Sequence, residues 1–157
     1  MNLLRPKHID ASESAAILLV RLVMGAAFIL HGWPKIQHAT TWMNAMGSSM
    51  PGPIQALSAL LEFGGGILLL LGLITPLGAL AIVLQMIGAL SLVHLPHHDP
   101  FVAVGKTSFE LPLLYLVVAG TILATGPGAF SLDALFFHER VRPETTFHGE
   151  RGPHPAI

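Results

Sequence analysis

The chain has 157 residues, of which 52% are hydrophobic and 11% are charged, and its formal net charge is −1. Soluble domains carry about 25% charged residues, and residues 63–98 contain no Asp, Glu, Lys or Arg at all. The composition therefore excludes an ordinary soluble domain and predicts an integral membrane protein. The lack of a basic run argues against nucleic acid as a partner. The absence of cysteine excludes disulfides, thiolate metal sites and thiol redox chemistry within this chain.

Apolar runs divide the chain into a short arm, a membrane domain and a tail. Residues 1–13 are too polar for a cleaved signal, so the first apolar run is expected to remain as a membrane helix. Residues 131–157 begin as an amphipathic segment and then become polar, which predicts a mostly disordered tail. The four-helix transmembrane domain is expected over residues 14–130, with spans at about 14–35, 56–75, 77–95 and 110–126.

The predicted fold class is an all-α, antiparallel four-helix membrane bundle. Thr75-Pro76 leaves room for only a very short turn, so the second and third spans must lie side by side. The positive-inside rule places both termini in the cytoplasm. The arm and the tail carry the basic residues Arg5, Lys7, Arg140, Arg142 and Arg151, against Lys35 and Lys106 in the opposite loops.

Each span carries one polar residue near the middle of the bilayer. At about 1.5 Å per residue, Arg21 lies roughly 10 Å, Gln85 14 Å, Tyr115 16 Å and Glu62 18 Å from the cytoplasmic end. An unpaired charge in lipid is costly, so we expect a buried Arg21–Glu62 ion pair. The pair has two interpretations, a structural one that fixes helix register and a catalytic one in which Glu62 handles protons. Gln85 and Tyr115 also have a structural and a functional interpretation. They either form contacts between helices or bind a ligand.

A second polar layer is expected near the outer end of the spans, and it contains His31, Lys35, His94 and Glu110. His94, His97, His98 and Asp99 are weak candidates for a metal site, because their spacing matches no recognised ligand pattern and Pro96 interrupts it. A haem held by His31 and His94 agrees with their depth, but nothing else in the sequence supports it.

Three consecutive glycines follow Glu62 in the second span. Gly65 and its neighbours allow another helix to approach closely, which is the usual role of small residues in membrane helices. They are equally compatible with space for a flat ligand beside Glu62.

Three motifs together resemble the DoxX family of small four-helix membrane proteins. They are RLVMGAAFILHGWPKI in the first span, LLEFGGGILLLLGLITPLGAL in the second and third, and GPGAFSLD after the fourth. The resemblance covers roughly residues 14–135. The chain departs from the family in the segment PHHDPFVAVGKTSFE, where many members have Gly-Phe-Phe and a later Gly-Gly, so the outer site is not expected to be shared unchanged. The family's recurring residues match Arg21, Gly25, His31, Gly32, Lys35, Glu62, Gly65, Gly72, His94, Glu110, Gly126, Gly128 and Asp133.

The resemblance implies a multi-pass protein of the inner membrane that is linked to redox complexes such as thiosulfate:quinone oxidoreductase, a terminal quinol oxidase and redox-stress complexes. The first hypothesis is thus a subunit that binds quinone and works with redox partner subunits. Its catalytic candidates are Glu62, Arg21 and His31, and its ligand-binding candidates are His94, Glu110, Lys35, Gln85, Tyr115 and Gly65. The alternative is a non-enzymatic scaffold, assembly factor or small-molecule carrier with a structural polar core, and either protein could form homo-oligomers in the lipid bilayer.

Overall fold

The computed structural model describes residues 10–44, 47 and 49–137, and these residues form helices and no strand. The all-α fold class is therefore confirmed. The basic residues of the arm and the tail lie outside the described residues, as does the tail beyond residue 137. The helices are α1 (Ala11–Gln37), α2 (Gly52–Leu71), α3 (Thr75–Ala89), the π-helical turn η2 (Leu90–His94), α4 (Glu110–Thr125) and α5 (Leu132–Phe137).

Three of the described helices are long and apolar enough to cross a membrane. They are α1, α2 and the continuous helix that α3 and η2 form over Thr75–His94. Helix α4 is equally apolar but has only 16 residues, a rise of about 24 Å against a hydrocarbon core of about 30 Å. That α4 is a fourth full span therefore stays a prediction.

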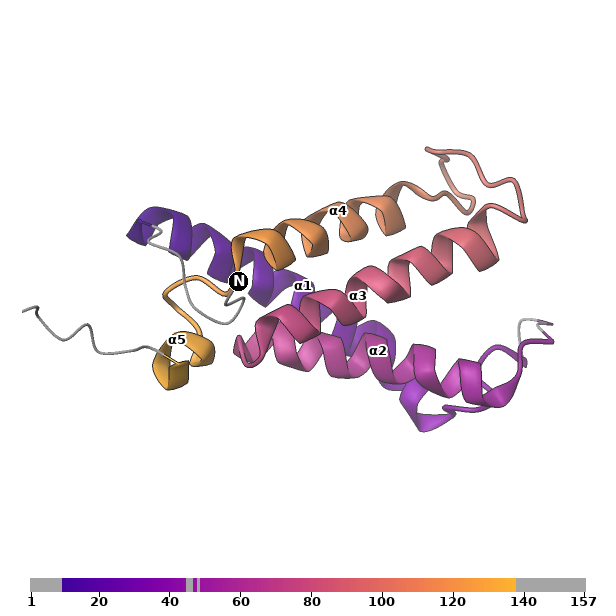
Figure 1. Ribbon diagram of the computed structural model, residues 1–157. Helices are drawn as coiled ribbons and strands as arrows, with labels where there is room; N and C mark the ends of the chain where they lie inside the picture. The colour runs from indigo at the N-terminus through magenta and orange to yellow at the C-terminus, as the bar shows by residue number, and fades with distance from the viewer. Residues whose placement is uncertain (1–9, 45–46, 48, 138–157) are drawn as a thin grey trace, which may run out of the picture.

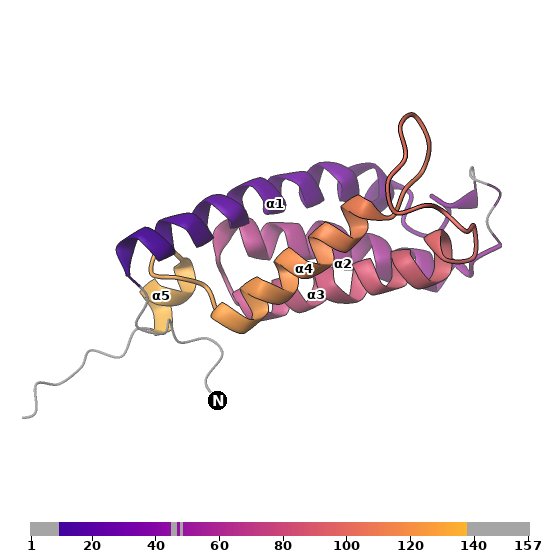
Figure 2. The same cartoon turned by 90° about the horizontal axis from the view of Figure 1, so that it is seen from above.

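The helices pack in chain order, with α1 on α2, α2 on α3 and α3 on α4 (Figures 1 and 2). The turn between α2 and α3, the end of α4 and helix α5 lie together at one end of the bundle, which we call the terminal end (Figure 1). The described residues of the connector 38–51 and the loop 95–109 lie at the opposite end, which we call the loop end (Figure 1).

Glycine sets how closely α2 approaches its two neighbours. A Cβ on Gly25 would stand 2.8 Å from the carbonyl oxygen of Gly66, so the backbones of α1 and α2 touch where they cross. A Cβ on Gly65 would stand 2.9 Å from Ile82 Cδ1 on α3. Gly65 had two interpretations, close helix packing and space for a ligand. Its position supports close helix packing, since α3 covers the side of α2 on which Gly65 lies.

Candidate functional site

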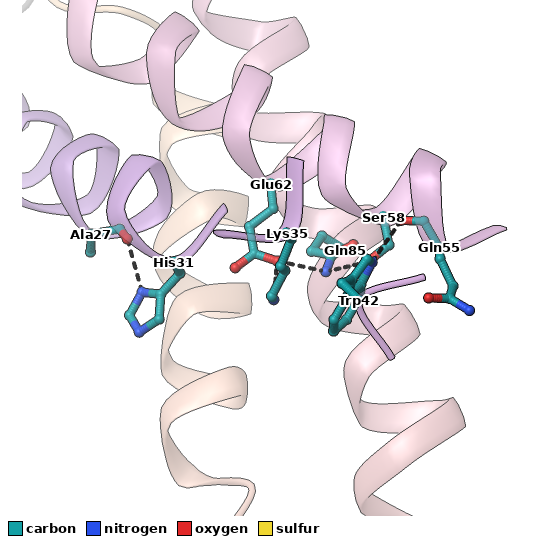
Figure 3. A network of polar contacts seen from close by, with 8 residues as sticks. All are labelled: Ala27, His31, Lys35, Trp42, Gln55, Ser58, Glu62 and Gln85. Carbon is teal, nitrogen blue, oxygen red and sulfur yellow. Dashed lines mark hydrogen bonds and ion pairs between the residues drawn. The ribbon is translucent and has the colours of Figure 1, made fainter. Parts of the chain in front are cut away.

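Glu62 is held by residues from three helices. Its side chain is 5% exposed, and Lys35 Nζ from α1 lies 2.5 Å from Glu62 Oε2. Gln85 Nε2 from α3 donates to the same oxygen at 3.1 Å and to Ser58 Oγ at 2.9 Å (Figure 3). The shared depth of Glu62 and Gln85 was predicted correctly from the sequence. The cation that pairs with Glu62 was not.

The predicted Arg21–Glu62 ion pair is wrong. Arg21 Nε donates to the carbonyl of Leu69 at 3.0 Å, and Leu69 lies seven residues beyond Glu62, about 10 Å further along α2. The error has a physical reason. Depth counting orders residues along the helix axis but does not tell which of two cations faces a given carboxylate, and it is Lys35 that lies beside Glu62.

Arg21 instead binds backbone carbonyl groups at the terminal end. Besides Leu69, its NH1 donates to the carbonyls of Pro127 at 2.7 Å and Phe130 at 3.1 Å. The guanidinium also packs directly against Gly72, where a Cβ would collide with it. Since Gly72 ends α2 in the left-handed region, at φ +65°, glycine meets both a conformational and a steric requirement there. Arg21 thus joins α1 to the end of α2 and to the segment after α4.

Asp133 caps α3 from the far end of the chain. Its carboxylate accepts hydrogen bonds from the backbone N–H groups of Ile74 at 2.6 Å and Thr75 at 2.7 Å. Ile74 occupies the N-cap position with φ +46°, a conformation that is strained for a β-branched residue. Because Ile74 has no polar side chain to cap the helix, Asp133 supplies the missing acceptor. This part of the polar framework is structural.

A pocket of about 330 Å³ opens at the loop end beside the Lys35–Glu62 pair. Lys35, Ser58 and Gln85 provide polar groups on its wall. The rest is mainly apolar and includes Trp42, Met43, Met50, Leu57, Leu84 and Leu92. The arrangement combines a largely apolar chamber with a few convergent polar groups, which is typical of sites for small organic ligands.

Gln55 shapes the connector that covers this pocket, and sequence reasoning missed it. The side chain is buried, accepts from the backbone N–H of Met43 at 2.9 Å and donates to Asn44 Oδ1 at 2.9 Å. Its backbone carbonyl accepts from Trp42 Nε1 at 2.9 Å. The Trp42 ring in turn lies 4.7 Å from Lys35 Nζ in a cation–π contact. The available signal was an amide residue two positions after the sequence PGP at residues 51–53, preceded by a segment that contains Trp42, Met43 and Met50.

The π-helical turn η2 brings His94 to the same pocket. His94 is nine residues beyond Gln85, which is two and a half turns of a regular α-helix, so the two would face opposite sides. In η2 the Leu95 N–H bonds instead to the carbonyl of Leu90, five residues back. This wider turn changes the register, and both His94 and Gln85 line the pocket. Single π turns inside helices are frequent at functional sites.

Asp99 fixes the ring of His94. Asp99 Oδ2 lies 2.7 Å from His94 Nδ1, and Asp99 Oδ1 accepts from Thr107 Oγ1 at 2.7 Å. The hydrogen bond from Thr107, followed by the one from His94, lowers the pKa of Asp99 below its ordinary value. Asp99 therefore stays a carboxylate throughout the neutral pH range.

Replacing Thr107 with Val is expected to raise the pKa of Asp99 towards its ordinary value. A lowered pKa in the folded state stabilises the fold above the pKa of the unfolded chain, and this contribution is lost as the pH falls through the folded value. The Thr107→Val protein should therefore lose less stability than the wild type between about pH 5 and pH 2. Carboxyl-carbon NMR of Asp99 measures the pKa directly, and an unchanged titration would contradict the assignment.

The remaining predicted site residues lie elsewhere. His31 is exposed and its Nδ1 lies 2.8 Å from the carbonyl oxygen of Ala27, away from the Glu62 network (Figure 3). Glu110 is exposed in the first turn of α4. The Tyr115 ring packs edge-on against Phe28 at 4.9 Å between centroids. The structure does not bring these three side chains into the pocket.

The histidines of the loop end do not form a metal centre in the part of the chain that the structure describes. No three His, Asp or Glu side chains gather there in a way that could hold an ion. His97 and His98 are exposed, and His94 is engaged with Asp99. The haem interpretation stays a prediction without support from the pocket, since His94 lines it and His31 does not.

Comparison with known proteins decides the family. The DoxX family model matches residues 16–95, about half of the chain. The chain belongs to the DoxX family. The resemblance inferred from the three motifs is thereby confirmed, and this DoxX protein is a membrane protein with transmembrane helices.

Three relatives cover most of this DoxX protein. "Inner membrane protein YqjF" of Escherichia coli is 38% identical over 128 residues, which are 78% of this chain and 93% of the relative. "Inner membrane protein YphA" of the same organism is 28% identical, covering 85% and 99% of the two chains. A protein of Bacillus subtilis named "Putative oxidoreductase CatD" is 31% identical, covering 82% and 92%. No solved structure matches this chain significantly.

Proposed function

We propose that this DoxX protein is an inner-membrane component of a redox system and binds the head group of a quinone in the pocket at the loop end. The observation that carries this proposal is an apolar pocket whose wall holds the lysine of a partly buried Lys–Glu ion pair. Two relatives are named inner membrane proteins and a third carries an oxidoreductase name, which supports the location and the redox link. Both termini are expected in the cytoplasm.

The chemistry of the pocket suits a quinone. A quinone ring is flat and apolar, and its two carbonyl oxygens accept hydrogen bonds. The Lys35 ammonium has three N–H groups, and its hydrogen bond to Glu62 uses one of them. Lys35 is therefore the group that would donate to a quinone oxygen. Reduction of a quinone takes up two electrons and two protons, so Glu62 behind Lys35 would be the nearest proton carrier, while the electrons would come from a partner subunit.

The alternative is a scaffold or carrier in which the polar residues only fix the packing. One observation favours it: Lys35, Glu62, Gln85 and Ser58 are already linked to one another by hydrogen bonds. The hydrogen bonds of Arg21 and Asp133 at the terminal end are structural under either hypothesis. Filling the pocket separates quinone binding from a scaffold role, because a scaffold does not require the space.

Gly88 gives a way to fill the pocket without breaking the fold. It lines the pocket, and a Cβ there would meet nothing within 4 Å. Gly88→Leu is expected to weaken quinone binding at least about tenfold by occupying the space, while helix propensity stabilises the helix by up to about 1 kcal/mol. Gly120→Leu on α4 is the matched control, because a Cβ there also meets nothing within 4 Å and Gly120 does not line the pocket.

Binding is measured through the fluorescence of Trp42, which lines the pocket. The chain has two tryptophans, so Trp33→Phe leaves Trp42 as the single reporter. Trp42→Phe leaves Trp33, which is 54% exposed and reports quinone dissolved in the surrounding lipid. Saturable quenching of Trp42 that Gly88→Leu removes and Gly120→Leu preserves supports the proposal. Equal, non-saturable quenching of both tryptophans would refute it in favour of the scaffold.

A further inference from the structure

His94 and Asp99 form a second polar group at the pocket, on the side away from Glu62 along α3 and η2. Their side chains are 15% and 10% exposed. Because Asp99 takes Nδ1, the ring presents Nε2 as the polar atom that remains for a ligand. With the carboxylate as acceptor, Nδ1 carries the hydrogen, so a neutral His94 offers Nε2 as an acceptor only.

An acceptor at this position discriminates between the two redox forms of a quinone. A quinone oxygen only accepts hydrogen bonds and gains nothing from a neutral Nε2. A hydroquinone hydroxyl donates, and it matches the neutral ring. When the ring is protonated the preference is lost, because Nε2–H then becomes a donor that a quinone oxygen and a hydroquinone hydroxyl oxygen can both accept.

We infer that His94, positioned by Asp99, accepts a proton from a hydroquinone bound in the pocket when the redox system runs in the direction of hydroquinone oxidation, and passes it to water at the loop end. The inference rests on the proposed function and deepens it. In this step the hydroquinone O–H bond breaks and an Nε2–H bond forms, which leaves a hydroquinone monoanion facing an imidazolium. The step is an acid–base reaction, and the electrons stay on the ligand.

The charges around His94 favour this proton transfer. Asp99 remains anionic and directly faces the imidazolium that forms. His97 in the same loop lies within electrostatic reach of Asp99. Lys35 lies on the same pocket, where its charge favours the monoanion, and Glu62 offsets Lys35. The product state thus holds the positive ring and the ligand anion each beside an opposite charge.

The exposed loop 95–109 gives a proton on His94 a route to water. Asp99 lies in the loop 95–109, whose residues His97, His98, Lys106 and Thr107 are exposed. Thr107 binds Asp99 from this exposed side. The register change in η2 is what makes His94 common to the pocket and to this loop, and it gives the π turn a chemical role.

The test is isothermal titration of the full chain in nanodiscs with a single-isoprene ubiquinone and, separately, with its hydroquinone kept reduced. Empty nanodiscs are the blank, and each form is titrated at pH 5.5 and pH 8. In the wild type the quinone is expected to bind about fivefold to tenfold more tightly at pH 5.5, the gain of one hydrogen bond from Nε2–H. The affinity of the hydroquinone should change less, because its hydroxyl group donates to the neutral ring and accepts from the protonated one. His94→Gln should abolish this pH dependence, and the matched loop variant His97→Gln should retain it.

The outcomes separate the inference from the proposed function. If Gly88→Leu removes binding but His94→Gln keeps the wild-type pH dependence, the role of His94 is wrong and the quinone site stands. If neither form binds the wild type above the blank, both fail. Asp99→Asn provides a second measurement, because loss of the carboxylate that holds Nδ1 should reduce the difference in affinity between the two redox forms at pH 8. An unchanged difference would overturn the positioning role of Asp99.

Discussion

Replacing Lys35 with Met is expected to lower the free energy of unfolding by about 3–5 kcal/mol. The reason is that Glu62, 5% exposed, would lose the cation 2.5 Å from its Oε2 and keep only the hydrogen bond from Gln85. A buried carboxylate without a cation either bears the cost of desolvation or takes up a proton. Unfolding in mixed micelles with increasing SDS measures the change.

The double variant distinguishes a charge effect from a packing effect. Lys35→Met combined with Glu62→Gln removes both charges, and it should recover more than half of the stability that Lys35→Met loses. Lys106→Met is the matched control, because Lys106 is exposed in the loop 95–109 and its loss should change stability by less than about 0.5 kcal/mol. A double variant as unstable as Lys35→Met alone would show that the lysine stabilises the fold through its cation–π contact with Trp42 and not through the ion pair with Glu62.

Replacing Arg21 with Met is expected to cost at least about 3 kcal/mol, since it leaves three carbonyl groups of the terminal end without their donor. Arg21→Lys should recover only part of this loss, because one ammonium lacks the planar fork that reaches several carbonyls at once. Arg21→Met should also destabilise the terminal end locally. Hydrogen exchange at the amides of Ile74 and Thr75 should become faster, since Asp133 and Arg21 belong to the same junction.

This prediction also separates structure from function. Arg21 does not line the pocket, so the folded fraction of Arg21→Met should bind quinone with wild-type affinity. Glu13→Gln is a suitable control, as an exposed change in the first turn of α1. Loss of quinone binding without loss of stability would contradict the structural role and return Arg21 to the candidates for the ligand site.

Several parts of the site were predictable, and others were not. Glu62 and Gln85 were expected at one depth, and they bond to each other. The same count put Arg21 with them, yet Arg21 turns towards the carbonyls of Leu69 and Pro127. A carbonyl acceptor leaves no mark in a sequence, because every residue has one. Reasoning from charges alone therefore assigns each cation to a carboxylate even when the backbone offers better geometry.

The roles of Gln55 in the connector and of His94 in the π turn could not be predicted from the sequence, for a related reason. The role of Gln55 depends on how the connector folds back over α2. His94 lines the pocket because of a register change in η2, and the apolar sequence of this turn does not predict that change. Both are consequences of long-range packing and local hydrogen bonding that hydropathy and spacing do not record.

The sequence by itself determined that this DoxX protein lies in a membrane, is helical and buries Glu62 in its second helix, because lipid tolerates few charges and no unpaired backbone groups. Tertiary structure alone decided that Lys35 and not Arg21 pairs with Glu62, that Arg21 and Asp133 tie the terminal end, and that Trp42, Gln85 and His94 share one pocket. The physical reason is that helical periodicity fixes depth and face within one helix, whereas the partner of a polar group is set by how the helices rotate and close upon one another.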